Sequence, residues 1–303
     1  MKTALLIPGQ GHAIARDALL WSRESPRVRS LVEIAAARAG VSAESLPRVE
    51  TSRGLPPEIL SPFHTALCLG IHLELAQRGF RPDFVAGHSL GEVSACAVAG
   101  ACSATAAIEL AAVRGRLMAR EAKAKPGGMV AIHAPDEAGA VEALAFAKEG
   151  GIAALAAYNA PGEWVISGEW SALRRLAARR PGILLPVHGA WHCELLAGAV
   201  EEYRAAALSA MQGTISIPLV CNQSGSIVRS SRDLPDRLAA QFTQPVQWNR
   251  CVSTMARGGV TEWAAVGPGR ALLLLNRRIP EARGAARAAC LPSDLRAFEP
   301  NPA

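Results

Sequence analysis

A Gly-x-Ser-x-Gly segment at residues 87–91 constrains the fold of this 303-residue chain more than any other feature of the sequence. The apolar run 84–86 before it predicts a strand, and the residues after it predict a helix. Glycines on both sides of Ser89 permit a sharp strand-to-helix turn that exposes the serine hydroxyl beside the free N–H groups of the helix start. The segment therefore predicts an α/β fold with Ser89 as a candidate nucleophile, and a capped turn without chemistry is the alternative.

The apolar pattern elsewhere in the chain also alternates between strands and helices. Short strands are expected at 4–7, 84–86 and 263–266. Ser61 is expected to cap a helix that has Pro62 in its first turn and runs to Gly79. One helix is expected directly after the serine segment, and Ser103 is expected to cap the helix that comes next. Strands that alternate with helices are typical of a mostly parallel sheet.

Residues 124–189 have a pattern of their own, which predicts an inserted subdomain. Strands are expected at 128–133, 152–158, 164–167 and 183–187, and helices at 135–148 and 169–180. The resulting βαββαβ order is the split βαβ arrangement of a ferredoxin-like unit. We therefore expect a large α/β-hydrolase-like domain with a parallel central sheet, formed by 1–123 and 190–303, and a ferredoxin-like subdomain at 124–189.

Composition excludes several classes of protein. Half of the residues are hydrophobic and 19% are charged, which excludes a disordered chain or a coiled coil. No apolar run is expected to cross a bilayer, and Pro8 interrupts the apolar start too early for a signal peptide, so a cytoplasmic protein without a membrane partner is expected. The net charge of +6 favours an acidic partner, but no basic run interleaved with aromatics indicates nucleic acid. Seven scattered cysteines predict reduced thiols, mostly in the core.

A serine hydroxyl needs a base to lose its proton at neutral pH, and histidine is the usual one. The histidines downstream of Ser89 are His133, His188 and His192. His192 follows directly after the predicted subdomain, where the chain returns to the large domain. Its position gives it only a small advantage over His188.

Four separated motifs resemble those of the malonyl-CoA:acyl carrier protein transacylase family, the acyltransferases of fatty acid synthesis and polyketide synthases. They are Ile-Pro-Gly-Gln-Gly at 7–11, Gly-His-Ser-Leu-Gly-Glu at 87–92, Tyr-Asn-Ala-Pro-Gly at 158–162 with Val-Ile-Ser-Gly at 165–168, and Pro-Val-Gln-Trp at 245–248 with Val-Gly-Pro-Gly at 266–269. The resemblance runs from residue 4 to about 279. It implies the inserted ferredoxin-like subdomain, no resident cofactor, a coenzyme A thioester as substrate, and an acyl carrier protein whose phosphopantetheine thiol receives the acyl group.

The resemblance also implies roles for individual residues. Ser89 would be the nucleophile and His192 the base, oriented by the backbone carbonyl of Gln241. The backbone N–H groups of Leu90 and Gln10 would form the oxyanion hole, in which each donor is typically worth about 2.7–4 kcal/mol.

Substrate selection would depend on Arg114, which matches the arginine that holds the free carboxylate of malonyl in this family. A guanidinium makes two parallel charge-assisted hydrogen bonds to a carboxylate, whereas acetyl has no group to pair with it. Arg116 is a nearby but weaker candidate. Asn159, in the third motif, is a further substrate-binding candidate.

The sequence departs from the family pattern at several positions. Trp191 stands before the implied base, and its bulk should exclude a methyl branch on the acyl group, which favours malonyl over methylmalonyl. His64 stands where the family has glutamine and is expected to alter the acyl pocket. Ile7 replaces a phenylalanine, and His12 and Ala13 replace Ser-Gln. These replacements are expected to change only the packing.

Three other functions compete with malonyl transfer, besides transfer of a different acyl group. An α/β-hydrolase could use Ser89, Asp136 and His192 in that chain order, although Asp136 is better explained as a helix cap. A thioester hydrolase of the same family would use the same serine and histidine, and the presence of Arg114 argues against it. A noncatalytic module that only docks carrier protein would not need these residues.

Overall fold

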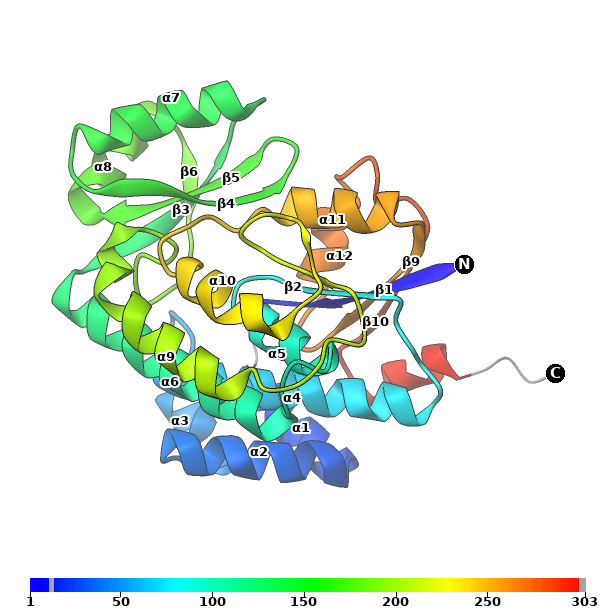
Figure 1. Cartoon of the computed structure of the whole chain (residues 1–303). Helices are drawn as coiled ribbons and strands as arrows, with labels where there is room; N and C mark the ends of the chain where they lie inside the picture. Colours follow the sequence, from blue (N-terminus) through cyan, green and yellow to red (C-terminus); the bar gives the residue numbers. More distant parts are fainter. Residues whose placement is uncertain (11–13, 300–303) are drawn as a thin grey trace.

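The computed structural model describes residues 1–10 and 14–299, and in that part of the chain the strands form two separate sheets (Figure 1). The larger sheet has the strand order β10-β9-β1-β2-β7-β8, and only β8 runs antiparallel to its neighbour. Its strands are β1 (Lys2–Ile7), β2 (Phe84–Gly87), β7 (Leu219–Val220), β8 (Ile227–Val228), β9 (Val260–Val266) and β10 (Ala285–Ala289). This sheet is the parallel centre that the alternating pattern predicts.

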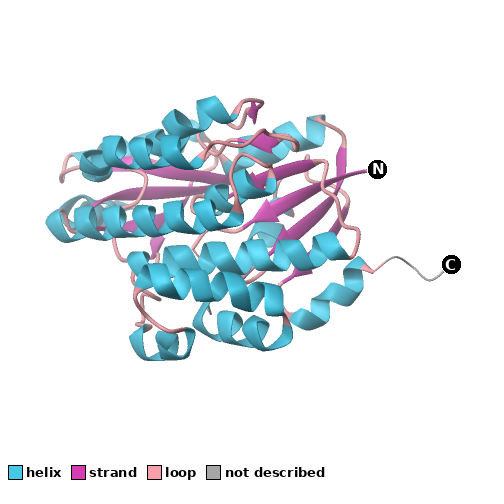
Figure 2. Ribbon diagram, turned by 60° about the horizontal axis from the view of Figure 1, so that its bottom comes forward, coloured by secondary structure: helices cyan, strands magenta, loops and turns pink. Residues whose placement is uncertain are grey.

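Helices cover both faces of the large sheet. In Figure 1, α1, α2, α4, α5 and α6 lie below it and α11 and α12 lie above it, and Figure 2 shows the strands between these helical layers. The helices of the large domain are α1 (Ile14–Glu24), α2 (Pro26–Ala39), α3 (Leu46–Val49), α4 (Pro57–Gln77), α5 (Gly91–Val98), α6 (Ala104–Ala124), α9 (Val200–Ala210), α10 (Leu234–Ala240), α11 (Trp248–Arg257) and α12 (Ala271–Asn276). Short 3-10 helices are η1 (Ala43–Ser45), η2 (Glu194–Ala199), η3 (Ser231–Asp233) and η4 (Pro292–Phe298).

The central strands place two turns side by side. Residues 4–7 of β1 are fully buried, as expected for a strand covered by helices on both faces. β1 and β2 are parallel, with Ile7 paired to Gly87 at their carboxyl ends. The turn after β1 and the turn that carries Ser89 therefore meet at one edge of the sheet, where ligands bind in open α/β folds.

The second sheet is antiparallel and has the order β4-β5-β3-β6 (Figure 1). Its elements are β3 (Gly127–His133), α7 (Glu137–Lys148), β4 (Ala153–Ala160), β5 (Glu163–Glu169), α8 (Trp170–Arg179) and β6 (Gly182–Leu184). The chain order and the strand order are those of a ferredoxin-like unit, so the predicted fold class is confirmed. β6 is shorter than the predicted 183–187, because after Leu184 the chain leaves the sheet and lines a cavity.

The small sheet is attached to the large domain along the edge of β4. Ala157 pairs with Val246 in an isolated parallel bridge. The N–H of Tyr158 donates to the Val246 carbonyl at 2.9 Å, and the N–H of Val246 donates to the Ala156 carbonyl at 2.9 Å. The Pro-Val-Gln-Trp motif at 245–248 is therefore the segment on which the small sheet is docked.

Helix α4 differs from the sequence prediction at its start. It begins at Pro57, not at Ser61, and Pro62 lies inside it. A proline at the first helical position loses no hydrogen bond, and the Leu60 N–H donates to the Pro56 carbonyl at 2.8 Å, so the helix can start five residues earlier, with Pro56 and not Ser61 at the cap position. Contrary to the sequence expectation, α4 is also long and apolar enough to span a membrane. However, 83% of its apolar 18-residue stretch is buried inside the protein, as in a core helix.

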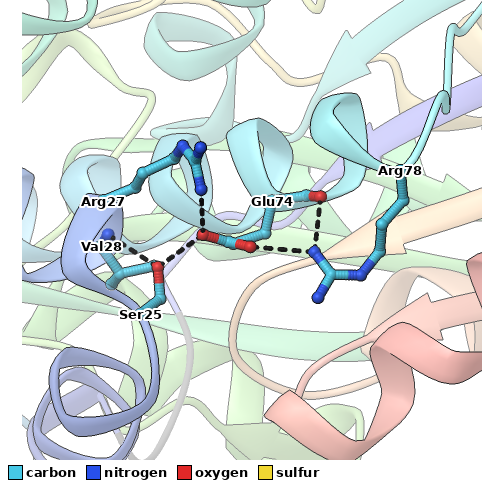
Figure 3. A network of polar contacts seen from close by, with 5 residues as sticks. All are labelled: Ser25, Arg27, Val28, Glu74 and Arg78. Carbon is cyan, nitrogen blue, oxygen red and sulfur yellow. Dashed lines mark hydrogen bonds and ion pairs between the residues drawn. The ribbon is translucent and has the colours of Figure 1, made fainter.

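A buried carboxylate joins α4 to the start of α2 (Figure 3). Glu74 Oε1 accepts hydrogen bonds from Ser25 Oγ at 2.7 Å and Arg27 Nη1 at 3.2 Å, and Oε2 accepts one from Arg78 Nη1 at 2.9 Å. Ser25 also caps α2 by accepting the Val28 N–H. Burial alone would raise the pKa of Glu74, but these hydrogen bonds outweigh it and hold the pKa below its usual value.

The seven cysteines are all free thiols, and only Cys102 is not fully buried. Six of the seven are buried, so the prediction that they lie mostly in the core is confirmed.

Candidate active site

Ser89 occupies a strained turn between β2 and α5. Its φ of 51° lies in the left-handed region, which L-residues other than glycine rarely adopt. The Asn222 side chain holds this conformation, because its Oδ1 accepts the Ser89 N–H at 2.8 Å and its Nδ2 donates to the Gly87 carbonyl. Gly91 is required for a different reason: a Cβ atom there would lie 2.3 Å from the Ile7 carbonyl oxygen.

His192 lies next to the serine hydroxyl. Its Nε2 is 2.8 Å from Ser89 Oγ, and its Nδ1 is 2.7 Å from the backbone carbonyl of Gln241. A carbonyl accepts only, so Nδ1 carries the proton and Nε2 faces the hydroxyl as an acceptor. Burial, and then the nearby Arg114 cation, lower the pKa of His192 to about 3, so the ring is neutral at physiological pH. This pair can therefore remove the proton of Ser89.

Two backbone N–H groups are candidates to stabilise negative charge beside the hydroxyl. Leu90 and Gln10 both line the cavity in front of Ser89. Within 1–10 and 14–299, neither N–H donates to a protein acceptor. Gly11 of the first motif and the departures at His12 and Ala13 lie outside the described residues.

Arg114 projects from α6 toward the serine and is buried. Its Nη2 donates to the Gln241 side-chain Oε1 at 2.9 Å and lies 3.2 Å from Ser89 Oγ. Arg116, the competing candidate, is exposed and does not line the cavity. Arg114 is the one lysine, arginine, aspartate or glutamate that lines this cavity in the described part of the chain.

The cavity in front of Ser89 has a volume of about 210 Å³. Much of its wall is apolar, and this part of the wall includes Leu60, Met118, Met129, Leu185, Trp191 and Leu272. Asn159 also lines it, and its Oδ1 is 2.9 Å from Nε2 of His88, the residue before the serine. The cavity combines a nucleophile, a base, one cation and an apolar wall, which suits an acyl group that carries a carboxylate.

His64 is a substrate-binding candidate that the structure places outside the cavity wall. It is fully buried and is not part of the cavity wall. Its ring nitrogens are 3.8 and 3.9 Å from Cys68 Sγ, and the backbone of Gly9 is also close. Burial lowers the pKa of His64 to about 4, so its ring is neutral. Its side chain packs behind the turn that forms the wall and does not line the cavity, so the expectation that His64 alters the acyl pocket stays a prediction.

Asp136 has the capping role that its position suggested. Its Oδ1 accepts the Gly139 N–H at 2.8 Å at the start of α7. Because the group on Nδ1 of His192 is the Gln241 carbonyl, Asp136 does not complete a serine–histidine–aspartate triad. His188, the competing base, contacts the Gly54 carbonyl at 3.2 Å.

Sequence reasoning missed two residues that support the site. Asn222 follows the two-residue strand β7, which pairs with β2, so its place at the end of a central strand was the available signal. Glu92 belongs to the second motif, but nothing in the sequence indicates what a buried carboxylate does there. The structure connects it to both Asn222 and Gln241.

An open α/β sheet with a serine on a strained turn, a neutral histidine and a buried arginine defines a class of acyl-transferring enzymes. The acyl transferase domain family matches residues 65–184 of this chain, which include Ser89 and all four strands of the small sheet.

Whole-length comparisons give the particular family. The chain is 33% identical to the malonyl CoA-acyl carrier protein transacylase of Mycobacterium tuberculosis over 96% of its length and 97% of the relative. It is 29% identical to the corresponding enzyme of Escherichia coli over 91% of the chain and 92% of the relative. The chain is also 28% identical to a chain in a solved complex of a malonyl-transacylase with a type II polyketide synthase acyl carrier protein. The TM-score of this match is 0.89, and it covers 98% of this chain and 99% of that chain. The chain belongs to the malonyl-CoA:acyl carrier protein transacylase family.

Proposed function

We propose that this protein transfers malonyl from coenzyme A to the phosphopantetheine thiol of an acyl carrier protein in the cytoplasm. The observation that carries the proposal is a buried Arg114 whose Nη2 is 3.2 Å from the hydroxyl of Ser89, which itself contacts His192. A cation beside the nucleophile binds an acyl group with a free carboxylate and has no partner in acetyl.

The reaction proceeds in two steps through an ester on Ser89. His192 takes the serine proton while the oxygen attacks the thioester carbonyl, and the N–H groups of Leu90 and Gln10 stabilise the oxyanion. The tetrahedral intermediate then expels coenzyme A, whose sulfur receives the proton from His192. In the second step His192 deprotonates the carrier protein thiol, which attacks the ester, and the released serine oxygen recovers the proton.

The Ser89→Ala variant tests the covalent intermediate. With malonyl-CoA, the wild type should gain the mass of one malonyl group in intact-protein mass spectrometry, and the variant should gain none because it lacks the nucleophilic oxygen. Labelling of Ser89→Ala would show that another residue carries the acyl group. A wild-type protein that gains no mass would instead support a docking module without catalytic activity.

The Arg114→Ala variant tests substrate selection. Without the guanidinium, labelling by malonyl-CoA should fall by about 100-fold, because a charge-assisted hydrogen bond to a carboxylate is lost. Labelling by acetyl-CoA should fall much less, so the ratio of the two rates is the measurement. An unchanged ratio would exclude Arg114 from the acyl site, and Arg116→Ala is the matched control on the same helix.

Product analysis separates transfer from hydrolysis by the same acyl-serine. Malonyl-loaded wild type is mixed with a phosphopantetheine-bearing carrier protein, and malonyl-carrier protein and free malonate are quantified. We expect malonyl-carrier protein as the main product. Free malonate as the main product would support the thioester hydrolase alternative, and preferential labelling by another acyl-CoA would change the substrate.

A further inference from the structure

The mechanism uses no acidic side chain, yet a carboxylate is buried directly beneath the nucleophile turn. Glu92, in the first turn of α5, is 1% exposed. Its Oε1 accepts the backbone N–H of Asn222 at 2.8 Å, and its Oε2 accepts Nε2 of the Gln241 side chain at 2.5 Å. Burial raises the pKa of Glu92, while the same hydrogen bonds act in the opposite direction.

The two partners of Glu92 both donate, and this determines how the Gln241 amide is oriented. Gln241 Nε2 donates to Glu92 Oε2 and to the Ser89 carbonyl, which is 3.2 Å away. Its Oε1 is therefore left to accept from Arg114 Nη2 at 2.9 Å. A reversed amide would place an oxygen against two acceptors and an NH₂ group against the guanidinium.

We propose that Glu92 is a positioning residue for substrate selection: it fixes the orientation of the Gln241 side-chain amide, and that amide holds Arg114 beside Ser89. The proposal rests on malonyl transfer as the proposed function. The carboxylate acts through Gln241 and does not touch the acyl group. The backbone carbonyl of Gln241 orients His192, so the base keeps this partner whichever way the Gln241 side-chain amide points.

The isosteric variant Glu92→Gln separates these two roles. The Asn222 N–H requires an acceptor, so the glutamine oxygen takes that side and its NH₂ group faces Gln241. Either two amide NH₂ groups then oppose each other or the Gln241 amide reverses, and reversal removes the acceptor from Arg114. In the first case repulsion pushes the Gln241 side chain from its place, and in the second its acceptor is lost, so both loosen the hold on Arg114 but leave the contact between Ser89 and His192.

The experiment measures single-turnover labelling of Ser89 by malonyl-CoA and by acetyl-CoA in the full-length protein. We expect Glu92→Gln to lower the malonyl-to-acetyl rate ratio by about tenfold, with the acetyl rate changed much less. Glu121→Gln is the matched control, because Glu121 is also a buried carboxylate, lies on α6 with Arg114, and pairs with Arg120 away from the cavity. That control should keep the wild-type ratio.

A second variant tests the route through the amide. Gln241→Met removes the side-chain amide but keeps the backbone carbonyl, so it should lower the ratio at least as much as Glu92→Gln. The double variant should then show no further loss, because both changes break the same connection. Additive losses, or equal losses for both acyl-CoA substrates, would overturn the proposal.

The outcomes also separate this inference from the proposed function. If the wild type shows no preference for malonyl-CoA, the proposed function fails first. If the wild type prefers malonyl and Glu92→Gln keeps that preference, only the role of Glu92 is disproved. If Glu92→Gln does not fold, an unchanged ratio in Gln241→Met still overturns the inference.

Discussion

The chemistry of the site depends on a histidine that stays neutral although it is buried beside a cation. The φ of His192 is 59°, a strained backbone conformation, and its ring is held by contacts with Ser89 Oγ and the Gln241 carbonyl. Burial first, and Arg114 second, lower the pKa of its ring to about 3. Only the neutral ring can take a proton from Ser89, so a low pKa keeps the base active in mildly acidic solution.

Replacing Arg114 by methionine should therefore move the acid limb of the reaction to higher pH. Without the neighbouring cation, protonation of His192 costs less and its pKa rises, so activity is lost earlier as the pH falls. The measurement is the labelling rate of Ser89 by acetyl-CoA between pH 4 and pH 7, since acetyl binding does not need the arginine. A variant whose rate, like that of the wild type, does not decline toward pH 4 would contradict this electrostatic role.

At the scale of the element, local patterns predicted the strands and helices well where a turn or cap bounds them. The serine segment positions β2 and α5 because only glycine fits at residue 91, and Ser103 caps α6 by accepting the Ala106 N–H. The predicted start of α4 was wrong because Pro57 and Pro62 are both compatible with the first turn of a helix. The observed helix α4, which is longer than predicted, packs against α2 and α6, and the local sequence pattern does not reveal this packing.

The contact between α2 and α4 depends on Glu74 and should respond to pH (Figure 3). The pKa of Glu74 is below its usual value in the folded protein, so its contribution to stability is present above the unfolded pKa and lost as the pH falls through the folded pKa. Glu74→Gln should lower the free energy of unfolding at pH 7 by about 1–3 kcal/mol.

Chemical denaturation of both proteins at pH 7 and at pH 4 checks this prediction. The difference between wild type and Glu74→Gln should shrink at the lower pH, because the wild type then loses part of the same interaction. A difference that is constant with pH would mean that the lost packing, and not the charge, accounts for the effect.

At the scale of the whole molecule, the site is assembled from segments that are far apart in the sequence. The sequence predicted Ser89 from its motif and His192 from its place after the subdomain together with the family resemblance, and the structure brings these two side chains into contact. It could not predict the connections made by Glu92 and Asn222, since these depend on the relative placement of β2, β7 and the segment after α10. Nor could it predict that Val246 docks the edge of the small sheet.

A chain of polar contacts also connects the small sheet to both parts of the large domain beside the serine. His88 contacts Asn159, whose Nδ2 donates to Glu163 Oε1 at 3.2 Å, and Glu163 pairs with Arg278 after α12. Arg278 donates further to the Pro161 carbonyl at 3.3 Å. The turn between β4 and β5 is therefore fixed against the cavity from two sides.

Breaking the Glu163–Arg278 pair should affect the reaction more than stability. The pair is partly exposed, so its contribution to the free energy of unfolding is about 0.2–1 kcal/mol and the melting temperature of Arg278→Met should change little. In the variant, however, Glu163 loses the cation that holds it, so it orients the Asn159 amide beside His88 less firmly, and labelling of Ser89 by malonyl-CoA should slow by about two- to fivefold. Arg175→Met is the control, because it breaks a comparably exposed pair with Glu149 that lies within the small subdomain. Equal rates for both variants would mean that the contact between the two domains does not position the site.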